Sequence, residues 1–268
     1  MNGPQSQRRI LVAVDASPLS LAALEAAADL ARRWQAELAA LFVEDVNLLR
    51  LATHPGIEVL SLLSARRQPV DRAAFEDILR AQLARARRAV EAAALSRQVA
   101  FTFTVRRGRV EVEVLAAAEE ADLLIAGWGG RGLGGGLGPP LLGSTARALA
   151  ERASRPLFLL RERMGPVHAV LVAYDGSPAS GRALALAAEI ARRDGGAIDV
   201  LLPARAPAEL EPAARAALAG GGLEIRCHAL DASGLRGAAR KAPGCVLVVA
   251  APVGEDLGEL PCSVVVVR

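Results

Sequence analysis

One long stretch of the chain occurs twice. "RRILVAVDASPLSLAALEAAADLARRWQAELAALFV" at 8–43 aligns without a gap with "HAVLVAYDGSPASGRALALAAEIARRDGGAIDVLLP" at 168–203, at an offset of 160. The ends match as well, because "RPLFLLR" at 155–161 and "PCSVVVVR" at 261–268 both carry an apolar run closed by Arg. Such a tandem duplication restricts the chain to an architecture of two similar units.

The two copies differ in length. Charged residues, Gly and Pro interrupt the pattern at "ERMGPV", so we predict one domain over 1–163 and a second over 164–268. Asp15 and Arg161 are 146 positions apart, whereas the matching Asp175 and Arg268 are 93 apart. The second copy lacks the 44–70 insertion, part of a long helix, and a glycine-rich stretch with the helix that follows it. The two domains therefore cannot have the same function.

Apolar runs alternate with helical patterns along each copy. In the first, the patterns predict strands at 10–14, 36–43, 99–105, 122–127 and 156–160, and helices from Pro18, over 71–95, from about 110 and from Ser144. In the second, strand candidates lie at 168–174, 197–202, 222–228, 244–250 and 263–268. Strands that are apolar throughout favour an α/β fold, with an open, mostly parallel five-stranded sheet and helices on both faces in each domain.

Composition excludes several classes of protein. No run of about eighteen uncharged apolar residues occurs and the start lacks a secretory pattern, so we expect a cytoplasmic protein with no membrane partner. The 29 acidic residues nearly balance 32 basic ones, which argues against a nucleic-acid partner. The three histidines are scattered without an acidic partner at a telling spacing. No metal ligand or catalytic residue is predicted from them.

The glycine-rich stretch "GWGGRGLGGGLGPPLLGST" at 127–145 follows the fourth predicted strand and precedes a helix. Glycines let backbone N–H groups approach an anion, and a helix N-terminus adds free N–H groups and a positive dipole end. Asp15 ends the first strand and lies at the same edge of the sheet, where ligands of parallel sheets bind. The pattern predicts a phosphate-sized pocket. The alternatives are a flexible loop, and a purely structural Asp15 that caps the helix at Pro18 or closes the "DAS" turn.

These motifs resemble the universal stress protein family. The first copy has "VAVDAS" at its first strand, Gly127 and Gly130 in "GWGG", Gly143, Ser144 and Thr145 in "LLGST", and "RPLFLLR" at its end. The resemblance implies a Rossmann-like domain that binds ATP or another adenine nucleotide, with or without Mg²⁺. Carried over by position, the implied binding residues are Asp15, Val43, Gly127, Gly130, Gly143, Ser144 and Thr145.

The resemblance has two departures. Twelve residues separate Gly130 from Gly143, against nine in the family motif. The second copy keeps Asp175 but has no glycine motif after "VLVVAAP", so we interpret it as a degenerate partner domain and Asp175 as a helix cap. The family commonly pairs through last strands, which implies that the two domains pair within one chain. A homodimer of whole chains stays open.

Three functions remain as hypotheses. The first is a non-enzymatic stress-response signalling module that binds an adenine nucleotide in its first domain. Binding is favoured over catalysis because phosphoryl transfer needs metal ligands and a base. No acidic residue apart from Asp15 is expected beside the glycine loop. The second is a slow ATPase. The third is a nucleotide-free interaction protein, in which the longer loop has disabled the site.

Overall fold

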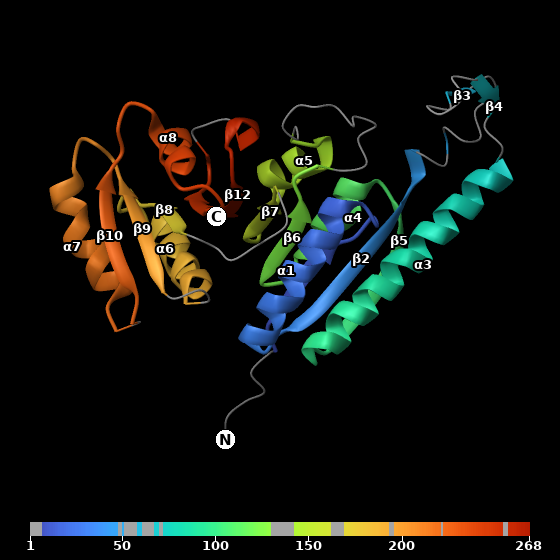
Figure 1. Cartoon of the computed structure of the whole chain (residues 1–268), viewed down its shortest axis with the longest axis horizontal. Coiled ribbons are helices and arrows are strands. Elements are labelled where there is room, and N and C mark those ends of the chain that lie inside the picture. Colours follow the sequence, from blue (N-terminus) through green and yellow to red (C-terminus); the bar gives the residue numbers. More distant parts are fainter. Residues whose placement is uncertain are drawn as a thin grey trace.

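The computed structural model describes residues 7–47, 50, 58–60, 67–69, 72–129, 142–161, 169–192, 196–220, 222–253 and 257–268. Its elements fall into a first half that ends with β7 and a second half that begins with β8 (Figure 1). The first half contains β1 (Arg9–Ala13), α1 (Pro18–Trp34), β2 (Glu37–Asp45), β3 (Glu58–Leu60), β4 (Arg67–Pro69), α3 (Arg72–Arg97), β5 (Phe101–Gly108), α4 (Val110–Ala118), β6 (Leu123–Gly127), α5 (Ser144–Arg152) and β7 (Leu157–Leu160). The second half contains β8 (Val170–Ala173), α6 (Pro178–Ala191), β9 (Ala197–Leu202), α7 (Pro207–Leu218), β10 (Glu224–Ala229), α8 (Gly234–Lys241), β11 (Val246–Ala250), η1 (Leu257–Glu259) and β12 (Ser263–Val267).

The strands of both halves form one sheet of ten. Its order is β10-β9-β8-β11-β12-β7-β6-β1-β2-β5, so each half contributes five parallel strands in the same relative order. The halves meet where β12 pairs antiparallel with β7. The predicted α/β class, the ten predicted strands and the pairing of the two last strands are confirmed. In each half the chain reverses direction along the sheet beside the first strand, between β1 and β6 and between β8 and β11.

Helices cover the two faces of this sheet, and strand residues alternate between them. On one face the buried core joins α1 and α3 to α6 and α7, with Ile10 and Val12 of β1 beneath them. On the other face a second core joins α4, α5 and α8, and includes Leu11. Because both cores run through residues of the two halves, the apolar burial that stabilises the fold is continuous across the junction.

The junction between the halves is an apolar strand pair closed by polar contacts. Phe158 of β7 lies opposite Val265 of β12, and both are fully buried. Arg161, which follows β7, donates from Nη1 to the carbonyl of Leu260 at 2.7 Å. Arg268, its repeat equivalent after β12, donates to the carbonyl of Ala150 at 3.0 Å. The arginine that closes each last strand therefore reaches into the opposite half.

The same serine starts the first helix of each half. Ser17 accepts a hydrogen bond from the Ser20 amide at 3.2 Å, and Ser177 accepts one from the Ser180 amide at 3.1 Å. A proline follows each serine, where its fixed φ suits the first helical turn and its missing N–H costs nothing. The two helices therefore begin in register with the strands before them.

The turns before these helices need a positive φ, at 61° for Ala16 and 84° for Gly176. We expect Gly176→Ala to lower the free energy of unfolding by about 1–2 kcal/mol, because a Cβ is strained there and would lie 2.8 Å from a Leu210 methyl. Gly181→Ala in α6 is the control, since a Cβ there meets nothing within 4 Å. This substitution is expected to raise the free energy of unfolding by about 0.5–1 kcal/mol. Urea titrations of both variants check the pair; equal effects would contradict the expectation.

The second half is simpler than the first on the α8 face. The first half has α4 and α5 there, and α4 packs directly on β1, β2 and β5. Between β11 and β12 the described residues of the second half form only η1. No described residues match the glycine-rich stretch or α5, as the sequence predicted.

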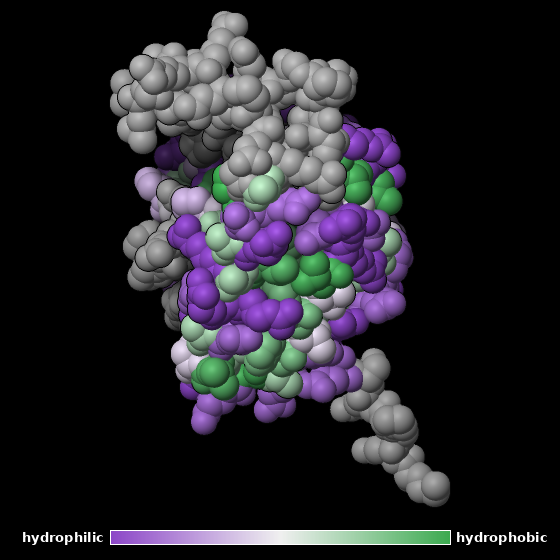
Figure 2. All heavy atoms as spheres, turned by 90° about the vertical axis from the view of Figure 1, so that its right-hand side faces the viewer, coloured by the Kyte–Doolittle hydropathy of each residue, from purple (hydrophilic) through white to green (hydrophobic). Residues whose placement is uncertain are grey.

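The edge of the sheet at β5 is protected by charge. Arg107 pairs with Glu44 at 2.8 Å and Arg106 with Glu113 at 3.7 Å, and charged edges disfavour pairing with another sheet. Figure 2 views this end and shows apolar surface in small areas among hydrophilic residues. No described helix is both long and apolar enough to cross a bilayer. Of the 44–70 insertion, the structure describes the short β3–β4 ribbon and flanking residues, and the rest lies outside the described residues.

Candidate functional site

A cavity of about 200 Å³ lies in the first half at the carboxyl ends of β1, β2 and β6. This is the point where the strand order reverses, the usual place for a ligand in an open parallel sheet. Four of the predicted site residues line it, namely Asp15, Val43, Gly127 and Thr145. Residues from the starts of α1, α4 and α5 close its sides, so the cavity is assembled from five or more separate segments.

Asp15, which lines this cavity, holds the turn before α1 by hydrogen bonds. Its Oδ1 accepts a hydrogen bond from the Ser17 amide at 2.9 Å, and its own amide donates to the Ser20 hydroxyl at 3.2 Å. Asp175 makes the same bonds with Ser177 and Ser180 in the second half. The aspartate therefore closes the turn before the first helix in both copies, and a ligand role for Asp15 stays a prediction.

The hydrogen bonds of this turn lower the pKa of the Asp175 carboxyl in the second half. The Ser177 side chain and amide, followed by the Ser180 side chain, hold the pKa of Asp175 below its ordinary value. This carboxyl therefore stays ionised at neutral pH as an acceptor for the turn. The N-cap of α6 is Ser177, so the prediction that Asp175 caps this helix is wrong, and Asp175 instead closes the turn before the helix.

Gly127 is required for packing. A Cβ on Gly127 would lie 3.1 Å from the Leu19 Cβ and 3.2–3.3 Å from the backbone of Leu19 and Ser20. The end of β6 thus touches the first turn of α1, and a side chain at Gly127 would make this contact tighter than most Cβ contacts in proteins. The close contact brings the two segments that carry Asp15 and the glycine motif to one edge of the cavity.

The two ends of the glycine-rich stretch are tied together. The Gly143 amide donates to the carbonyl of Trp128 at 3.0 Å, and the Trp128 amide donates to the carbonyl of Leu160 at 2.6 Å. Gly129 lines the cavity, whereas Gly130 and the rest of 130–141 lie outside the described residues. Both described ends of the stretch are thus fixed to the sheet.

The N-terminus of α5 lies beside the cavity. Gly143 is the N-cap and provides no side-chain cap, so the first amides of the helix have no capping group from that residue. Thr145 and Ala146 line the cavity, while Ser144 is exposed and does not. Uncapped amides at a helix start are a favourable place for an anion. The predicted "GST" end therefore reaches the cavity through Thr145.

The end of β2 adds a carboxylate that sequence reasoning missed. Val43 lines the cavity as predicted, but β2 continues two residues further, and Asp45 lies in the same wall. The expectation that no acidic residue besides Asp15 lies near the glycine stretch is therefore wrong. The only available signal was the acidic "ED" directly after Val43. Among the described lining residues there are two carboxylates and no Lys, Arg or His.

Trp128 is a core residue. It is fully buried in the core on the α5 face and does not line the cavity. The guanidinium carbon of Arg161 lies 5.1 Å from the centre of its ring, a cation–π distance. The buried ring therefore connects the start of the glycine-rich stretch to the β7–β12 junction.

One histidine has an acidic neighbour that its sequence spacing conceals. His228 Nε2 lies 2.9 Å from Asp199 Oδ1, across the adjacent strands β9 and β10. The sequence analysis did not predict this pair, because a separation of 29 residues is not a telling spacing. The described residues nevertheless contain no group of three or more His, Cys, Asp or Glu that could hold a metal ion.

A sequence model of the Universal stress protein family matches residues 7–161 and 166–250. No curated protein gives a significant match. Among solved structures, a universal stress protein from Archaeoglobus fulgidus DSM 4304 is 17% identical, with 97% of this chain and 98% of that chain covered and a TM-score of 0.71. A putative universal stress protein from Pseudomonas aeruginosa UCBPP-PA14 is 18% identical, with 98% and 93% covered and a TM-score of 0.54. These two structures share the fold of the whole chain.

Proposed function

The chain belongs to the universal stress protein family, and on that premise we propose that its first half binds an adenine nucleotide, whose presence or absence regulates the protein in a stress response. The observation that carries the proposal is the cavity at the point where strand order reverses. It brings Asp15, Val43, Gly127 and Thr145 together although they are far apart in the sequence. The predicted residues Gly143 and Ser144 flank it at the start of α5.

The cavity has different groups for the two ends of a nucleotide. Val43, Leu41, Leu79 and Val114 provide apolar walls for a base. The backbone of β2 at Val43 is the hydrogen-bonding group that a purine edge would meet. Gly129 and the first turn of α5 lie on the opposite side, where backbone amides suit phosphate oxygens. The arrangement thus favours a ligand with an aromatic base and a phosphate group.

The charge of the cavity favours a nucleotide that carries Mg²⁺. Asp15 and Asp45 line the wall, and no cationic side chain among the described lining residues offsets them. A bare polyphosphate would be repelled by two carboxylates, whereas Mg²⁺ is commonly held by one or two carboxylates together with substrate phosphates. Asp15 and Asp45 are the residues that would hold the ion. The Mg²⁺ would reduce the electrostatic repulsion between these carboxylates and the phosphates.

Binding is favoured over catalysis. Phosphoryl transfer needs positioned metal ligands and a group that orients or deprotonates the nucleophile. The described lining contains no histidine or lysine, and the Asp15 carboxylate already accepts the amide of its own turn. We propose that occupancy changes the glycine-rich stretch and is passed through Trp128 to Leu160 and Arg161 at the junction of the halves.

The proposal predicts that the purified protein releases adenine nucleotide on denaturation and that the emptied protein binds Mg-ATP in calorimetry. Asp15→Asn keeps a side-chain acceptor for the turn but removes the charge, so we expect Mg-ATP affinity to fall about tenfold with little change in stability. Asp175→Asn is the matched control, because it alters the same turn in the second half. It should leave Mg-ATP affinity unchanged.

Two results would decide against this function. A protein that carries no nucleotide and gives no heat with Mg-ATP, Mg-ADP, Mg-AMP or cAMP would favour an interaction protein with a disabled loop. Steady phosphate release above background, lost in Asp15→Asn and kept in Asp175→Asn, would favour the slow ATPase. Addition of EDTA should weaken ATP binding if Asp15 and Asp45 hold Mg²⁺.

A further inference from the structure

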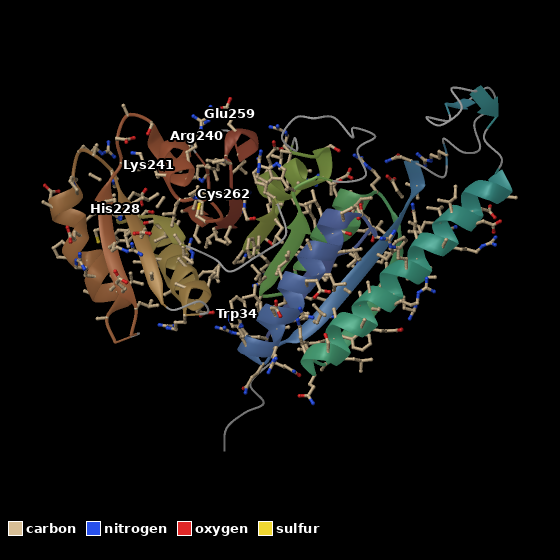
Figure 3. The ribbon with its side chains drawn as sticks, viewed as in Figure 1. Trp34, His228, Arg240, Lys241, Glu259 and Cys262 are labelled. Atoms are coloured by element: carbon tan, nitrogen blue, oxygen red, sulfur yellow. The ribbon has the colours of Figure 1, made fainter. Side chains whose placement is uncertain are left out.

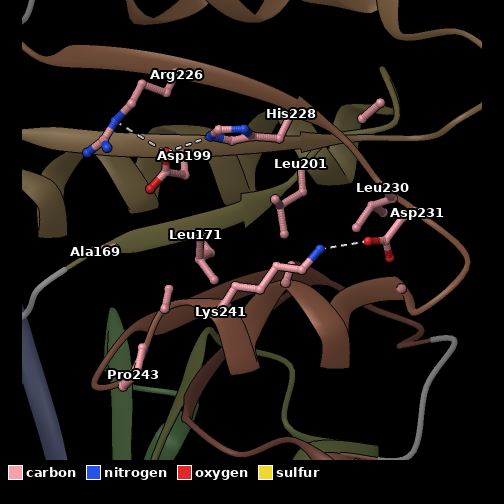
Figure 4. A pocket seen from close by; sticks show the side chains of 14 residues that line it. Ala169, Leu171, Asp199, Leu201, Arg226, His228, Leu230, Asp231, Lys241 and Pro243 are labelled. Carbon is pink, nitrogen blue, oxygen red and sulfur yellow. Dashed lines mark hydrogen bonds and ion pairs between the residues drawn. The ribbon is translucent and has the colours of Figure 1, made fainter.

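The second half contains a larger cavity of about 740 Å³, within the range of roughly 300–1,000 Å³ typical of small-molecule sites. It lies between α8 and the face of β8, β9 and β10. Figure 3 shows His228 on the β10 side and Lys241 on α8. Figure 4 shows Leu171 and Leu201 between a row formed by Arg226, Asp199 and His228 and the long side chain of Lys241. The walls are therefore apolar in the middle and polar on two sides.

The first half has almost no cavity at the equivalent place. The space there, lined by Leu11 and Leu41 at the positions of Leu171 and Leu201, is about 30 Å³. Arg9 contributes to its wall and reaches Glu120, just beyond the end of α4, at 3.1 Å. The second half has Ala169 at the position of Arg9, which removes this bulk. The cavity is thus a property of the second half and not of the repeated fold.

A buried carboxylate stands at the wall of this cavity. Asp199 is 8% exposed, and its repeat equivalent in the first half is the buried Ala39. Asp199 Oδ1 lies 2.9 Å from His228 Nε2 and 3.4 Å from Arg226 Nε. Burial of a carboxylate destabilises the fold unless the carboxylate is paired. The equivalent position of the first half holds Ala39 in a strand of the same topology. Asp199 is therefore not needed to form the strand, and its effect is to hold Arg226 and His228 at the wall.

Hydrogen-bond donors remain at this wall after the ion pairs are counted. Arg226 directs Nε to Asp199 and, at 3.6 Å, to the exposed Glu224, and its two terminal NH₂ groups have no partner among the described residues. Lys241 donates one N–H to Asp231 at 2.7 Å and has two more. Asp199 and Asp231 offset Arg226 and Lys241 in charge, so the wall has an excess of hydrogen-bond donors and not of positive charge.

We propose that this cavity binds a small organic anion with an apolar body and a single carboxylate or sulfonate group. The body packs on Leu171, Leu201 and Leu230, and the anionic group accepts hydrogen bonds from Arg226, assisted by Lys241. A carboxylate or sulfonate accepts bonds from the terminal groups of an arginine in a favourable planar geometry. The second half is then a ligand-binding domain with its own site, independent of a nucleotide in the first half.

Anilinonaphthalene sulfonate is a suitable probe, since it combines an aromatic body with one sulfonate and fluoresces on apolar burial. N-phenylnaphthylamine has the same body without the charge. We expect the full chain to bind one anilinonaphthalene sulfonate tightly and the uncharged analogue more weakly. Arg226→Gln should weaken the sulfonate about tenfold and leave the analogue unchanged. Arg240→Gln, an exposed arginine on α8 that does not line the cavity, is the matched control.

A second variant keeps the test decisive if Arg226→Gln is unstable. Ala238→Phe fills the cavity from α8 without altering a charge, and should abolish binding of both probes while thermal unfolding stays cooperative. Saturating Mg-ATP should not displace the sulfonate. The proposal is overturned if anilinonaphthalene sulfonate does not bind, if Arg226→Gln and Ala238→Phe both leave its affinity unchanged, or if Mg-ATP displaces it competitively.

Discussion

Expressed alone, residues 1–163 are expected to form a dimer through β7 and not a stable monomer. In the full chain both faces of β7 are buried, and its outer edge pairs with β12. Removal of the second half leaves an apolar strand with free N–H and C=O groups at the centre of what was a continuous sheet. Such an edge recruits another strand, and a second copy of β7 is the closest replacement for β12.

Light scattering of the truncated chain at several concentrations measures this outcome. Leu159→Lys in the truncated chain is the control, because Leu159 lies opposite Val264 in the intact sheet and a lysine there should block pairing. The truncated Leu159→Lys protein is expected to be monomeric and less stable than the dimer. A truncated chain that is monomeric without this substitution, and as stable as the full chain, would show that the junction contributes little.

Trp128→Ala is expected to destabilise the full chain by about 3–5 kcal/mol, the usual loss for deleting a large buried aromatic side chain. Trp128 is among the largest fully buried side chains, and its ring also faces Arg161 at the junction. Trp128→Phe keeps an aromatic ring and removes a buried Nε1 that has no hydrogen-bond partner among the described residues. Most of the stability should therefore be kept in that variant.

Denaturant titration and Mg-ATP calorimetry of the two variants separate packing from ligand contact. If Trp128 acts only by supporting the glycine-rich stretch, Trp128→Phe keeps both stability and nucleotide affinity. Loss of nucleotide affinity in Trp128→Phe at unchanged stability would show instead that the indole contacts the ligand. That result would contradict the placement of Trp128 outside the cavity.

The order of strands and helices could be predicted because it depends on local pattern. The apolar runs predicted as strands all became strands, and Ser17 and Ser177 marked helix starts through their own hydrogen bonds. The internal repeat then predicted that both halves share one topology. The domain limits 1–163 and 164–268 stay predictions.

The features that sequence reasoning missed depend on neighbouring strands. Asp45 reaches the cavity because β2 extends past Val43, which the apolar pattern did not indicate. Asp199 meets His228 because of the register of β9 and β10, and a spacing of 29 residues carries no sign of it. The second cavity depends on the small side chain of Ala169, which stands where the first half has Arg9. The sequence alone does not show which neighbours surround this position.

The antiparallel junction of β7 and β12 gives one chain the form of a symmetric pair, and this has a genetic consequence. In a homodimer every substitution appears in both subunits, so a change that suits one site is imposed on the other. Here Ala169 and Asp199 occur only in the second half, and the equivalent positions of the first half hold Arg9 and Ala39. Covalent linkage therefore keeps the mutual support of a dimer interface while each half can accumulate its own substitutions, so that the two halves can form different pockets.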